Sequence, residues 1–240
     1  MRSSRSDPDP LDPGPAGYAH RGLHGRGVPE NSLSSFQAAL DFGAGIECDV
    51  CLSGDGEVLV FHDHDLKRLC GIEGSVEGTR AEVLAAKRLL GTQATIPWLT
   101  ELLDLVAGRA PILIEAKVWK GNAARLAAAI AADLADYAGP VGVMSFDPRV
   151  CWWFARNLPY RHRGLVVSSR ASALERWTAV GFGSPSFLSV ERKLLGSRWA
   201  AKARTKFNLY SWTITTAEQG AQARVHADAL IWEGDGRPGI

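Results

Sequence analysis

The chain has 240 residues, of which 46% are hydrophobic and 22% are charged, and this is enough apolar sequence for one substantial core. Lys and Arg number 27 against 26 for Asp and Glu, so the formal net charge of +1 gives no overall field that would attract nucleic acid or an anionic membrane. No uninterrupted apolar run approaches the roughly 20 residues of a membrane-spanning helix. A transmembrane segment is therefore excluded.

The first 15 residues are rich in Asp and Pro and include Asp7-Pro8-Asp9-Pro10 and Asp12-Pro13-Gly14-Pro15. A segment of this composition cannot bury enough apolar surface to offset the entropy lost on ordering. We therefore expect residues 1–15 to form a disordered arm and residues 16–240 to form a single domain. The arm begins with basic residues, but no apolar stretch follows them, so a secretory signal is not indicated.

Along the rest of the chain, short apolar runs alternate with helical patterns, as is typical of βα units in a parallel sheet. The predicted strands are 16–20, 44–51, 57–62, 111–116, 141–146, 163–168, 186–191, 208–214 and 228–233, and the alanine-rich segment 122–138 is the clearest predicted helix.

Nine strands are one too many for an eight-stranded barrel, and loop length identifies the extra one. Only Ser53-Gly54-Asp55-Gly56 separates the second strand from the third, whereas a parallel crossover needs roughly a dozen residues. These two strands must therefore form an antiparallel hairpin. The remaining eight predict a closed (β/α)₈ TIM barrel, with the strand at 57–62 folded back over its mouth.

The cysteines favour a reducing compartment, because four of them in a chain this long do not form the pattern of a disulfide framework. We therefore predict a cytoplasmic protein. Cys48 and Cys51 spell C-x-x-C, but residues three apart on a strand point to opposite faces. We interpret them as small apolar core residues and not as a metal or disulfide pair.

Two acidic residues lie on the second predicted strand, in Ile46-Glu47-Cys48-Asp49-Val50. Side chains alternate along a strand, so Glu47 and Asp49 share one face, roughly 6–7 Å apart along it. Two carboxylates that point into a barrel repel each other unless a hard cation such as Mg²⁺ or Ca²⁺ compensates them. The alternative is a solvated surface strand, but the apolar flanks favour a cation site.

The fourth predicted strand, which ends in Glu115-Ala116-Lys117, places an acid and a base on one face at its C-terminal end. The C-terminal ends of barrel strands carry the active sites of TIM barrels. Glu-x-Lys on its own is equally consistent with a structural ion pair. Its position favours the functional interpretation.

Two histidines end strands that lead to the same mouth. His20 ends the first predicted strand and His62 ends the hairpin strand. Histidine titrates near neutral pH and can carry protons during displacement at phosphorus. A single buried histidine is usually structural, but two at strand ends beside polar neighbours favour catalysis. The other four are interpreted as surface or loop residues: His24, His64, His162 and His226.

An ordered set of short motifs supports this interpretation. The motifs are Ala19-His20-Arg21-Gly22, Pro29-Glu30-Asn31-Ser32, Ile46-Glu47-Cys48-Asp49-Val50, Leu59-Val60-Phe61-His62-Asp63, Ile96-Pro97-Trp98-Leu99 and Ile114-Glu115-Ala116-Lys117. In order and spacing they resemble the glycerophosphodiester phosphodiesterase family, which belongs to the phospholipase-C-like superfamily of TIM barrels. A looser similarity extends the resemblance over about residues 17–234.

The resemblance implies a hydrolase that cleaves glycerophosphodiesters to sn-glycerol 3-phosphate and an alcohol with one divalent cation, Mg²⁺ or Ca²⁺. It also implies roles for the residues already singled out. Glu47, Asp49 and Glu115 would be metal ligands. His20 and His62 would be the general acid and base, and the motifs do not tell which is which.

Four further residues receive roles from the resemblance. Arg21 and Lys117 would hold phosphate oxygens, because a phosphodiester anion needs its charge screened before a nucleophile approaches. Glu30 would help at the metal or at the glycerol. Asn31 would open the first helix beside the phosphate.

The chain departs from the family at two places near its C-terminal end. It has Trp212-Thr213-Ile214-Thr215 where the family commonly has Trp-Thr-Val-Asn, and Trp232-Glu233-Gly234-Asp235 where the family has a Thr-Asp-x-x-Pro-like ending. Both segments are expected on the far side of the mouth, where the leaving alcohol or the glycerol would lie. Trp212 and Trp232 either form an apolar wall there or are packing residues.

Two alternatives remain. The first is a lysophospholipase D-like enzyme of the same superfamily, which the eight tryptophans keep open because its substrate carries an acyl chain. The second is a barrel that binds phosphorylated ligands without catalysis. As in related phospholipases, the expected reaction course is attack by the neighbouring glycerol hydroxyl, giving a cyclic phosphate that water then opens. The motifs indicate a small-molecule partner and no particular oligomeric state.

Overall fold

The computed structural model describes residues 9–239, in which the strands form one sheet. All nine predicted strands are present, with ends within two residues of those expected. They are β1 (Tyr18–His20), β2 (Gly45–Leu52), β3 (Val58–Val60), β4 (Ile112–Ala116), β5 (Val141–Ser145), β6 (His162–Val167), β7 (Phe187–Glu191), β8 (Asn208–Ile214) and β9 (Ala229–Trp232).

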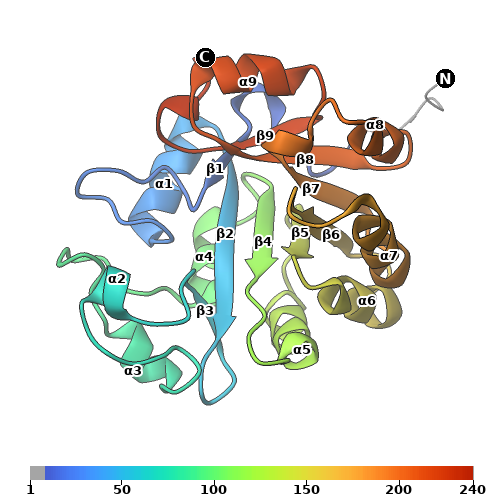
Figure 1. The fold of residues 1–240 in the computed structure, drawn as a ribbon. Helices are drawn as coiled ribbons and strands as arrows, with labels where there is room; N and C mark the ends of the chain where they lie inside the picture. Colours follow the sequence, from blue (N-terminus) through green and yellow to red (C-terminus); the bar gives the residue numbers. More distant parts are fainter. Residues whose placement is uncertain (1–8, 240) are drawn as a thin grey trace.

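Eight of these strands close into a parallel barrel, and β3 lies outside the ring. The order around the ring is β1-β2-β4-β5-β6-β7-β8-β9, and β1 closes it by pairing with both β2 and β9. β3 pairs with β2 in the antiparallel direction, with Val60 opposite Val50 and Val58 opposite Leu52. The TIM barrel and its extra hairpin strand are both confirmed (Figure 1).

The helices lie outside the ring of strands (Figure 1). They are α1 (Leu33–Phe42), α2 (Lys67–Cys70), α3 (Ala81–Ala85), α4 (Leu99–Val106), α5 (Ala123–Asp133), α6 (Pro148–Asn157), α7 (Ala173–Gly183), α8 (Arg198–Arg204) and α9 (Ala217–Arg224), with 3₁₀ helices at Gly14–Ala16, Arg192–Leu194 and Gly234–Gly236. None of the helices within residues 9–239 is both long and apolar enough to cross a bilayer.

Local sequence explains where the helices begin and end. Ser32 accepts a hydrogen bond from the Ser35 backbone N–H and caps α1, and Gly43, with a φ of 80°, ends it. Asp147 caps α6 in the same way, and Pro148 occupies its first turn. The alanine-rich helix expected over 122–138 ends at Asp133, because helix propensity alone does not fix a C-terminus.

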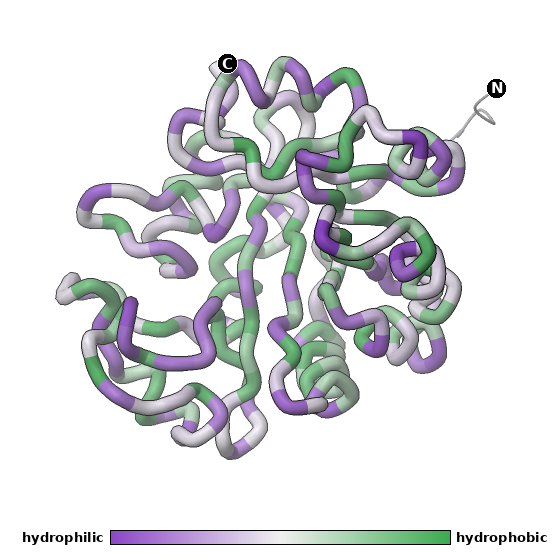
Figure 2. The backbone as a smooth tube through the Cα atoms, in the orientation of Figure 1, coloured by the Kyte–Doolittle hydropathy of each residue, from purple (hydrophilic) through white to green (hydrophobic). Residues whose placement is uncertain are grey.

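The hairpin rests on a small core of its own, separate from the barrel core. Leu59 and Phe61 are fully buried against Leu66, Leu69 and Leu84 from the region of α2 and α3. Burial of such side chains stabilises the fold by about 1.5–3 kcal/mol each. The connection from β3 to α2 is mostly hydrophilic, whereas the barrel strands are mainly hydrophobic (Figure 2). The hairpin is therefore anchored from outside while its polar end faces the mouth.

The N-terminal segment differs from expectation. Residues 1–8 of the expected disordered arm lie outside the described residues. From Asp9 onwards the prediction is wrong: Leu11 is 1% exposed, its carbonyl accepts a 2.5 Å hydrogen bond from Tyr18 Oη, and the Asp9 carboxylate accepts one from Tyr210 Oη. Composition averages over a segment, and it missed a single apolar anchor that packs at the N-terminal end of the strands.

Candidate active site

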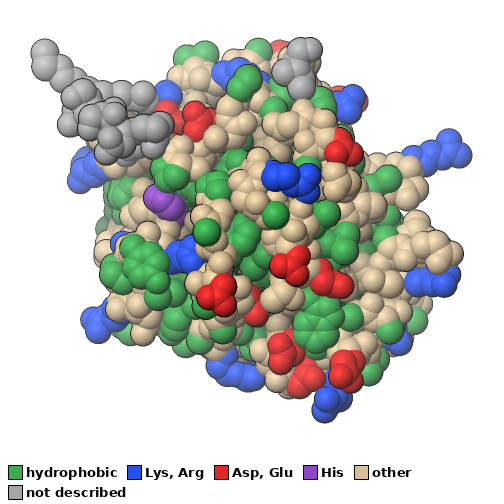
Figure 3. Space-filling view, turned by 180° about the vertical axis from the view of Figure 1, so that it is seen from behind, with side chains coloured by type: hydrophobic (Ala, Val, Ile, Leu, Met, Phe, Trp, Pro, Cys, Tyr) green, Lys and Arg blue, Asp and Glu red, His purple; other side chains and the backbone are tan. Residues whose placement is uncertain are grey.

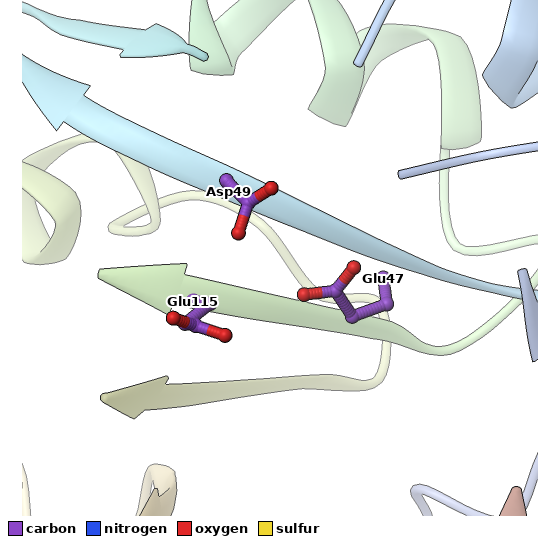
Figure 4. Close-up of side chains that lie close together, drawn as sticks. All are labelled: Glu47, Asp49 and Glu115. Carbon is purple, nitrogen blue, oxygen red and sulfur yellow. The ribbon is translucent and has the colours of Figure 1, made fainter. Parts of the chain in front are cut away.

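The three predicted acids converge inside the mouth of the barrel. Glu47 and Asp49 point from one face of β2 towards β4, which carries Glu115 (Figure 4). Asp49 is in register with Glu115, and each of the three can place a carboxylate oxygen within 4.8 Å of the other two. All three side chains are buried. The parallel register of β2 and β4 therefore builds a carboxylate cluster from two strands.

The cluster contains more negative charge than its surroundings readily accommodate. Burial, reinforced by the charge of Asp49, raises the pKa of Glu47 to about 8. Burial also disfavours the ionised form of Asp49, but the nearby Lys117 and Arg21 hold the pKa of Asp49 well below its usual range. Without further positive charge, Glu47 is therefore the carboxyl that retains a proton near neutral pH.

Two basic side chains contact the acids directly. Lys117 Nζ lies 2.9 Å from Asp49 Oδ1 and 2.5 Å from Glu115 Oε1, and Arg21 Nε lies 2.9 Å from Asp49 Oδ2. Burial opposes the charge of Lys117, but Asp49 and Glu115 more than offset this and raise the pKa of Lys117. Lys117 is therefore a fixed positive charge at the centre of the site.

His20, at the end of β1, is oriented by a carboxylate. Its Nδ1–H donates a 2.7 Å hydrogen bond to Glu233 Oε2, and its Nε2 lies 4.0 Å from Glu47 Oε2. Burial favours the neutral imidazole, but Glu47 and Glu233 raise the pKa of His20. Since Glu233 occupies Nδ1, Nε2 is the nitrogen left to exchange a proton in the mouth.

His62 is also held by a carboxylate. It follows β3, and the preceding Phe61 backbone N–H donates to the Asp49 carbonyl at 2.9 Å, which ties the hairpin end to β2. His62 Nδ1 lies 2.7 Å from Asp63 Oδ1, and Asp63 accepts a 2.6 Å hydrogen bond from Arg68 Nε. The hairpin thus delivers a second carboxylate-supported histidine to the mouth.

The turn after β1 positions Arg21. Arg21 and Gly22 both have positive φ, 57° and 78°, and a Cβ on Gly22 would lie 2.4 Å from Ser35 Oγ. This turn directs the Arg21 backbone N–H to Glu47 Oε2 at 3.1 Å, and Arg21 Nη1 donates to Glu30 Oε1 at 2.7 Å. Only glycine fits at position 22, so the position of Arg21 in the site depends on this glycine.

Asn31 supports Asp49 and does not open the helix. Its Nδ2 donates to Asp49 Oδ2 at 3.0 Å, and its Oδ1 accepts from the Asp49 backbone N–H at 3.2 Å. The cap of α1 is Ser32, one residue later. The expected placement of Asn31 at the start of the helix is therefore wrong, because an Asn at 1% exposure uses its amide on the buried carboxylate.

A central cavity of about 240 Å³ lies over the cluster, beside a larger one of about 460 Å³ that shares His62, Glu115 and Lys117 with it. Seven of the ten predicted site residues line the central cavity, and Asp49, Glu30 and Asn31 are not among its lining residues. The seven are His20, Arg21, Glu47, His62, Glu115, Lys117 and Trp212.

The two tryptophans near the C-terminal end have different positions. Trp212 lines the central cavity, donates from Nε1 to the Ser189 carbonyl at 3.1 Å and packs edge-on against Phe146. Trp232 is 1% exposed, and its Nε1 donates to the Ala16 carbonyl. Only Trp212 can contact a ligand in the mouth, and Trp232 is a packing residue.

Several residues of the site were not predicted. Glu233 was noted only as a departure from a motif, and its distance of 213 positions from His20 gives no local signal. Arg68 joins Glu30 to Asp63, which sequence spacing does not reveal. His64, interpreted as a loop residue, stacks on Trp119 at 4.1 Å in the wall of the larger cavity. These contacts depend on loop conformation.

A closed parallel barrel with acids, bases and histidines at the C-terminal ends of its strands has the layout of a TIM-barrel enzyme site. The model of the glycerophosphoryl diester phosphodiesterase family matches residues 20–233, and the chain belongs to this family.

Individual relatives match shorter stretches. A Bacillus altitudinis protein named glycerophosphodiester phosphodiesterase is 40% identical over 106 residues, which are 40% of this chain and 42% of that protein. A protein of the same name from Caldanaerobacter subterraneus subsp. tengcongensis is 34% identical over 100 residues, which are 38% of this chain and 40% of that protein. The aligned stretches therefore span about two fifths of these relatives' own length.

Solved structures match nearly the whole chain. An Oleispira antarctica phosphodiesterase in complex with the product sn-glycerol-3-phosphate has a TM-score of 0.82 at 22% identity, covering 92% of this chain and 94% of that chain. A Thermotoga maritima glycerophosphodiester phosphodiesterase has a TM-score of 0.74 at 25% identity, covering 90% and 92%. These likenesses establish the fold.

Proposed function

We propose that this protein is a metal-dependent phosphodiesterase that hydrolyses glycerophosphodiesters to sn-glycerol 3-phosphate and an alcohol. The observation that carries the proposal is the pairing of two functional layers in one mouth. A buried carboxylate cluster shares one cavity with two histidines, each supported at Nδ1 by a carboxylate. Family membership and the named activities of the relatives support the same conclusion.

The carboxylate cluster fits a single divalent cation. The three acids can place carboxylate oxygens within 4.8 Å of one another, and the raised pKa of Glu47 indicates a site short of positive charge. Glu47, Asp49 and Glu115 would hold the ion, and an all-oxygen set suits Mg²⁺ or Ca²⁺. When bound, the cation would screen the phosphodiester charge and make a coordinated hydroxyl more acidic.

The two histidines are proposed as the general acid and the general base. The base takes the proton of the glycerol hydroxyl next to the phosphate while that oxygen forms a bond to phosphorus. The bond from phosphorus to the alcohol oxygen breaks, and the acid gives that oxygen a proton. Water then opens the cyclic phosphate. Detection of 1,2-cyclic glycerophosphate supports this course, whereas one inverting transfer of solvent oxygen to phosphorus contradicts it.

Basic residues complete the proposed phosphate site. Arg21 and Lys117 line the central cavity and would neutralise the non-bridging phosphate oxygens. Glu30 would act through Arg21, because it accepts the hydrogen bond from Arg21 Nη1. Asn31 would hold Asp49 in place for the cation. Trp212 would limit the cavity beside the glycerol or the leaving alcohol.

A lysophospholipase D-like activity is the second candidate, and the larger cavity favours it. That cavity of about 460 Å³ opens beside Glu115 and Lys117, and Val76, Trp119 and Phe146 give it apolar walls. An acyl chain would fit such walls better than a small head group does. Turnover of glycerophosphocholine compared with lysophosphatidylcholine separates the two, and activity confined to the lipid would replace our proposal.

We also propose that the protein works in a reducing compartment, and the cysteines support this. All four are free, and Cys48, Cys51 and Cys151 are buried. Unpaired thiols of this kind are typical of a reducing compartment such as the cytoplasm.

One experiment tests the proposed function directly. Release of sn-glycerol 3-phosphate is measured on a panel of glycerophosphodiesters after chelation and after return of Mg²⁺ or Ca²⁺ separately. We expect activity that disappears with chelator, returns with one or both ions, and falls by about 10²–10⁴-fold in His20→Ala and in His62→Ala. Full activity in His20→Ala, or in chelator, would contradict the proposal. Absence of product release from the wild type with either ion would favour a barrel that only binds its ligand.

A further inference from the structure

The balanced charge of the whole chain conceals a strongly basic region. Residues 148–206, which run from α6 to the end of α8, contain twelve Lys and Arg residues but only two acids, Glu175 and Glu191, which leaves 15 basic and 24 acidic residues elsewhere. Seen from behind, blue side chains lie along both edges of the molecule, including the edge that corresponds to the α6 to α8 side of Figure 1, and red ones gather in the lower middle (Figure 3). Two acids from outside the segment, Asp147 and Asp228, pair with Arg149 and Arg204, so this side keeps an excess of positive charge.

Neither acid in this region neutralises the outer faces of the helices. Glu175 accepts a hydrogen bond from the Ser172 backbone N–H at the start of α7. Glu191 accepts from the Ser169 backbone N–H and lies 3.8 Å from Lys193 in the loop after β7. Within residues 9–239, no ion pair joins Arg156, Arg198 or Lys202 to an acid, and all three are exposed.

The same helices expose large apolar side chains. Leu174, Thr178 and Phe182 are four residues apart on α7, so they lie along one outward stripe that has no charge. Leu174 is 77% exposed and Phe182 is 50% exposed. Phe182 stacks on the exposed Trp152 of α6, with ring centroids 6.1 Å apart and planes 10° apart. The outward face of a helix in a soluble domain is normally polar, so this stripe is unusual.

Basic groups border the apolar stripe on both sides. The Arg156 guanidinium lies 4.6 Å from the centre of the Trp152 ring, and Lys202 Nζ lies 5.7 Å from the Trp177 ring. Aromatic and aliphatic side chains framed by Lys and Arg are the composition of surfaces that insert shallowly into a bilayer and meet anionic head groups. We define the α6–α8 surface by its exposed residues Trp152, Arg156, Leu174, Phe182, Arg198 and Lys202.

We propose that the α6–α8 surface docks the protein peripherally on an anionic phospholipid bilayer. A second copy of the chain fits less well, because a two-fold interface would set this positive surface against itself. Nucleic acid fits less well because the aliphatic Leu174 has no partner on a phosphate backbone. Docking would also bring the mouth near the lipid, since Asp147 both caps α6 and lines the larger cavity.

Vesicle sedimentation of the full chain tests this proposal. We expect binding to vesicles of equal parts phosphatidylcholine and phosphatidylglycerol, little binding to pure phosphatidylcholine, and weakening by salt. Each basic residue near the surface contributes about a fivefold effect. The Arg156→Glu/Lys202→Glu variant should therefore bind at least about tenfold more weakly. Trp152→Ser/Phe182→Ser should also lose binding while retaining turnover of a soluble glycerophosphodiester.

Matched changes outside α6, α7 and α8 serve as controls. Arg88→Glu/Arg125→Glu removes the same charge, and Val83→Ser removes an exposed apolar group on α3, and both variants should bind vesicles like the wild type. Absence of binding to the anionic vesicles, or equal loss in the controls, overturns the proposal. A wild-type dimer that Trp152→Ser/Phe182→Ser converts to a monomer also overturns it, as does tighter binding to duplex DNA than to the vesicles.

Discussion

At the scale of single residues, the site is organised by the unequal treatment of its acids. Glu47 and Asp49 are two positions apart on one strand face, yet their pKa values move in opposite directions. Lys117 and Arg21 contact Asp49, whereas the nearest basic group recorded for Glu47 is His20 at 4.0 Å. Contact with fixed charge outweighs burial at Asp49 but not at Glu47. Glu47 is therefore the residue through which pH should act on the metal-free protein.

The first prediction concerns the stability of the metal-free protein. The folded-state pKa of Glu47, about 8, is above its ordinary value of 4.5, so the folded state binds the extra proton between these pH values. The Glu47 carboxyl therefore lowers the free energy of unfolding as pH rises from about 5 to about 8. In chelator, we expect Glu47→Gln to match the wild type near pH 5 and to melt several degrees higher near pH 8, since about 1 kcal/mol corresponds to roughly 2–4 °C.

Thermal unfolding in chelator across this pH range is the measurement. Glu82→Gln, at an exposed position of α3, is the control and should follow the wild type at every pH. Parallel melting curves for Glu47→Gln and wild type at all pH values would show that the buried carboxyl does not carry the extra proton.

The second prediction concerns the partner of His20. Glu233 holds His20 Nδ1 and helps to raise the pKa of His20, so removal of its charge in Glu233→Gln should lower that pKa. The limb of the pH–rate profile that belongs to His20 should then move to lower pH, and kcat/KM should fall by about tenfold or more. Asp235→Asn, two positions away and exposed, should change neither. A lower rate with an unmoved profile would assign Glu233 a purely structural role.

Sequence patterns located the charged residues but not their partners. Strand alternation predicted that Glu47 and Asp49 share a face, because the period of two is fixed by the backbone. The Glu233–His20 and Arg68–Asp63 contacts join residues whose separation depends on loops, and no periodicity encodes them. Asn31 illustrates the same limit, since its motif was recognised but its placement at the helix start was wrong by one residue.

At the scale of elements, the β2–β3 hairpin determines whether the second histidine reaches the site. A loop of four residues was enough to predict it, because so short a connection cannot cross between parallel strands. The short helices α2 and α3 hold the hairpin from outside, and their four and five residues are too few to show a helical period in the sequence. Phe61 connects these helices to the site, because it is buried against the α2 and α3 region and immediately precedes His62.

The third prediction distinguishes a loss of activity caused by a displaced hairpin from a loss caused by lower stability of the whole fold. Phe61→Leu and Phe154→Leu each shrink a fully buried aromatic side chain, and each should cost less than the roughly 3–5 kcal/mol of a full truncation to Ala. Phe154 lies in α6, away from the acids, and its variant should keep its activity at temperatures where it is folded. Phe61→Leu should lose activity beyond what its stability explains. Equal activity in the two folded variants would mean that His62 does not depend on the hairpin core.

At the scale of the whole molecule, the barrel brings distant segments into one site and also packs the segment at Asp9–Pro15 against its base. The closed ring was predictable because eight strands that alternate with helices are the pattern of a (β/α)₈ barrel. The N-terminal correction was not predictable from composition, because Leu11 becomes an anchor only once Tyr18 and the strand ends form its binding place. Closure also places β2 beside both β1 and β4, and this brings His20 to the acids.

The last prediction joins the cation to the stability of the entire fold. A cation that binds only the folded state should raise the melting temperature of chelator-treated protein, by an amount equivalent to about 2.7 kcal/mol at a concentration 100 times its dissociation constant. Glu47 must lose its proton to bind the ion, so the increase should be larger near pH 8 than near pH 6, with protons released on binding. Thermal shift and proton release in weakly buffered solution measure this without any assay of activity.

Glu47→Gln and Glu115→Gln should lose most of the increase in melting temperature, whereas Glu82→Gln should keep it. An increase that is the same at both pH values, or that survives in both cluster variants, would show that the cation binds elsewhere. The cluster of three buried acids would then need an explanation other than metal binding.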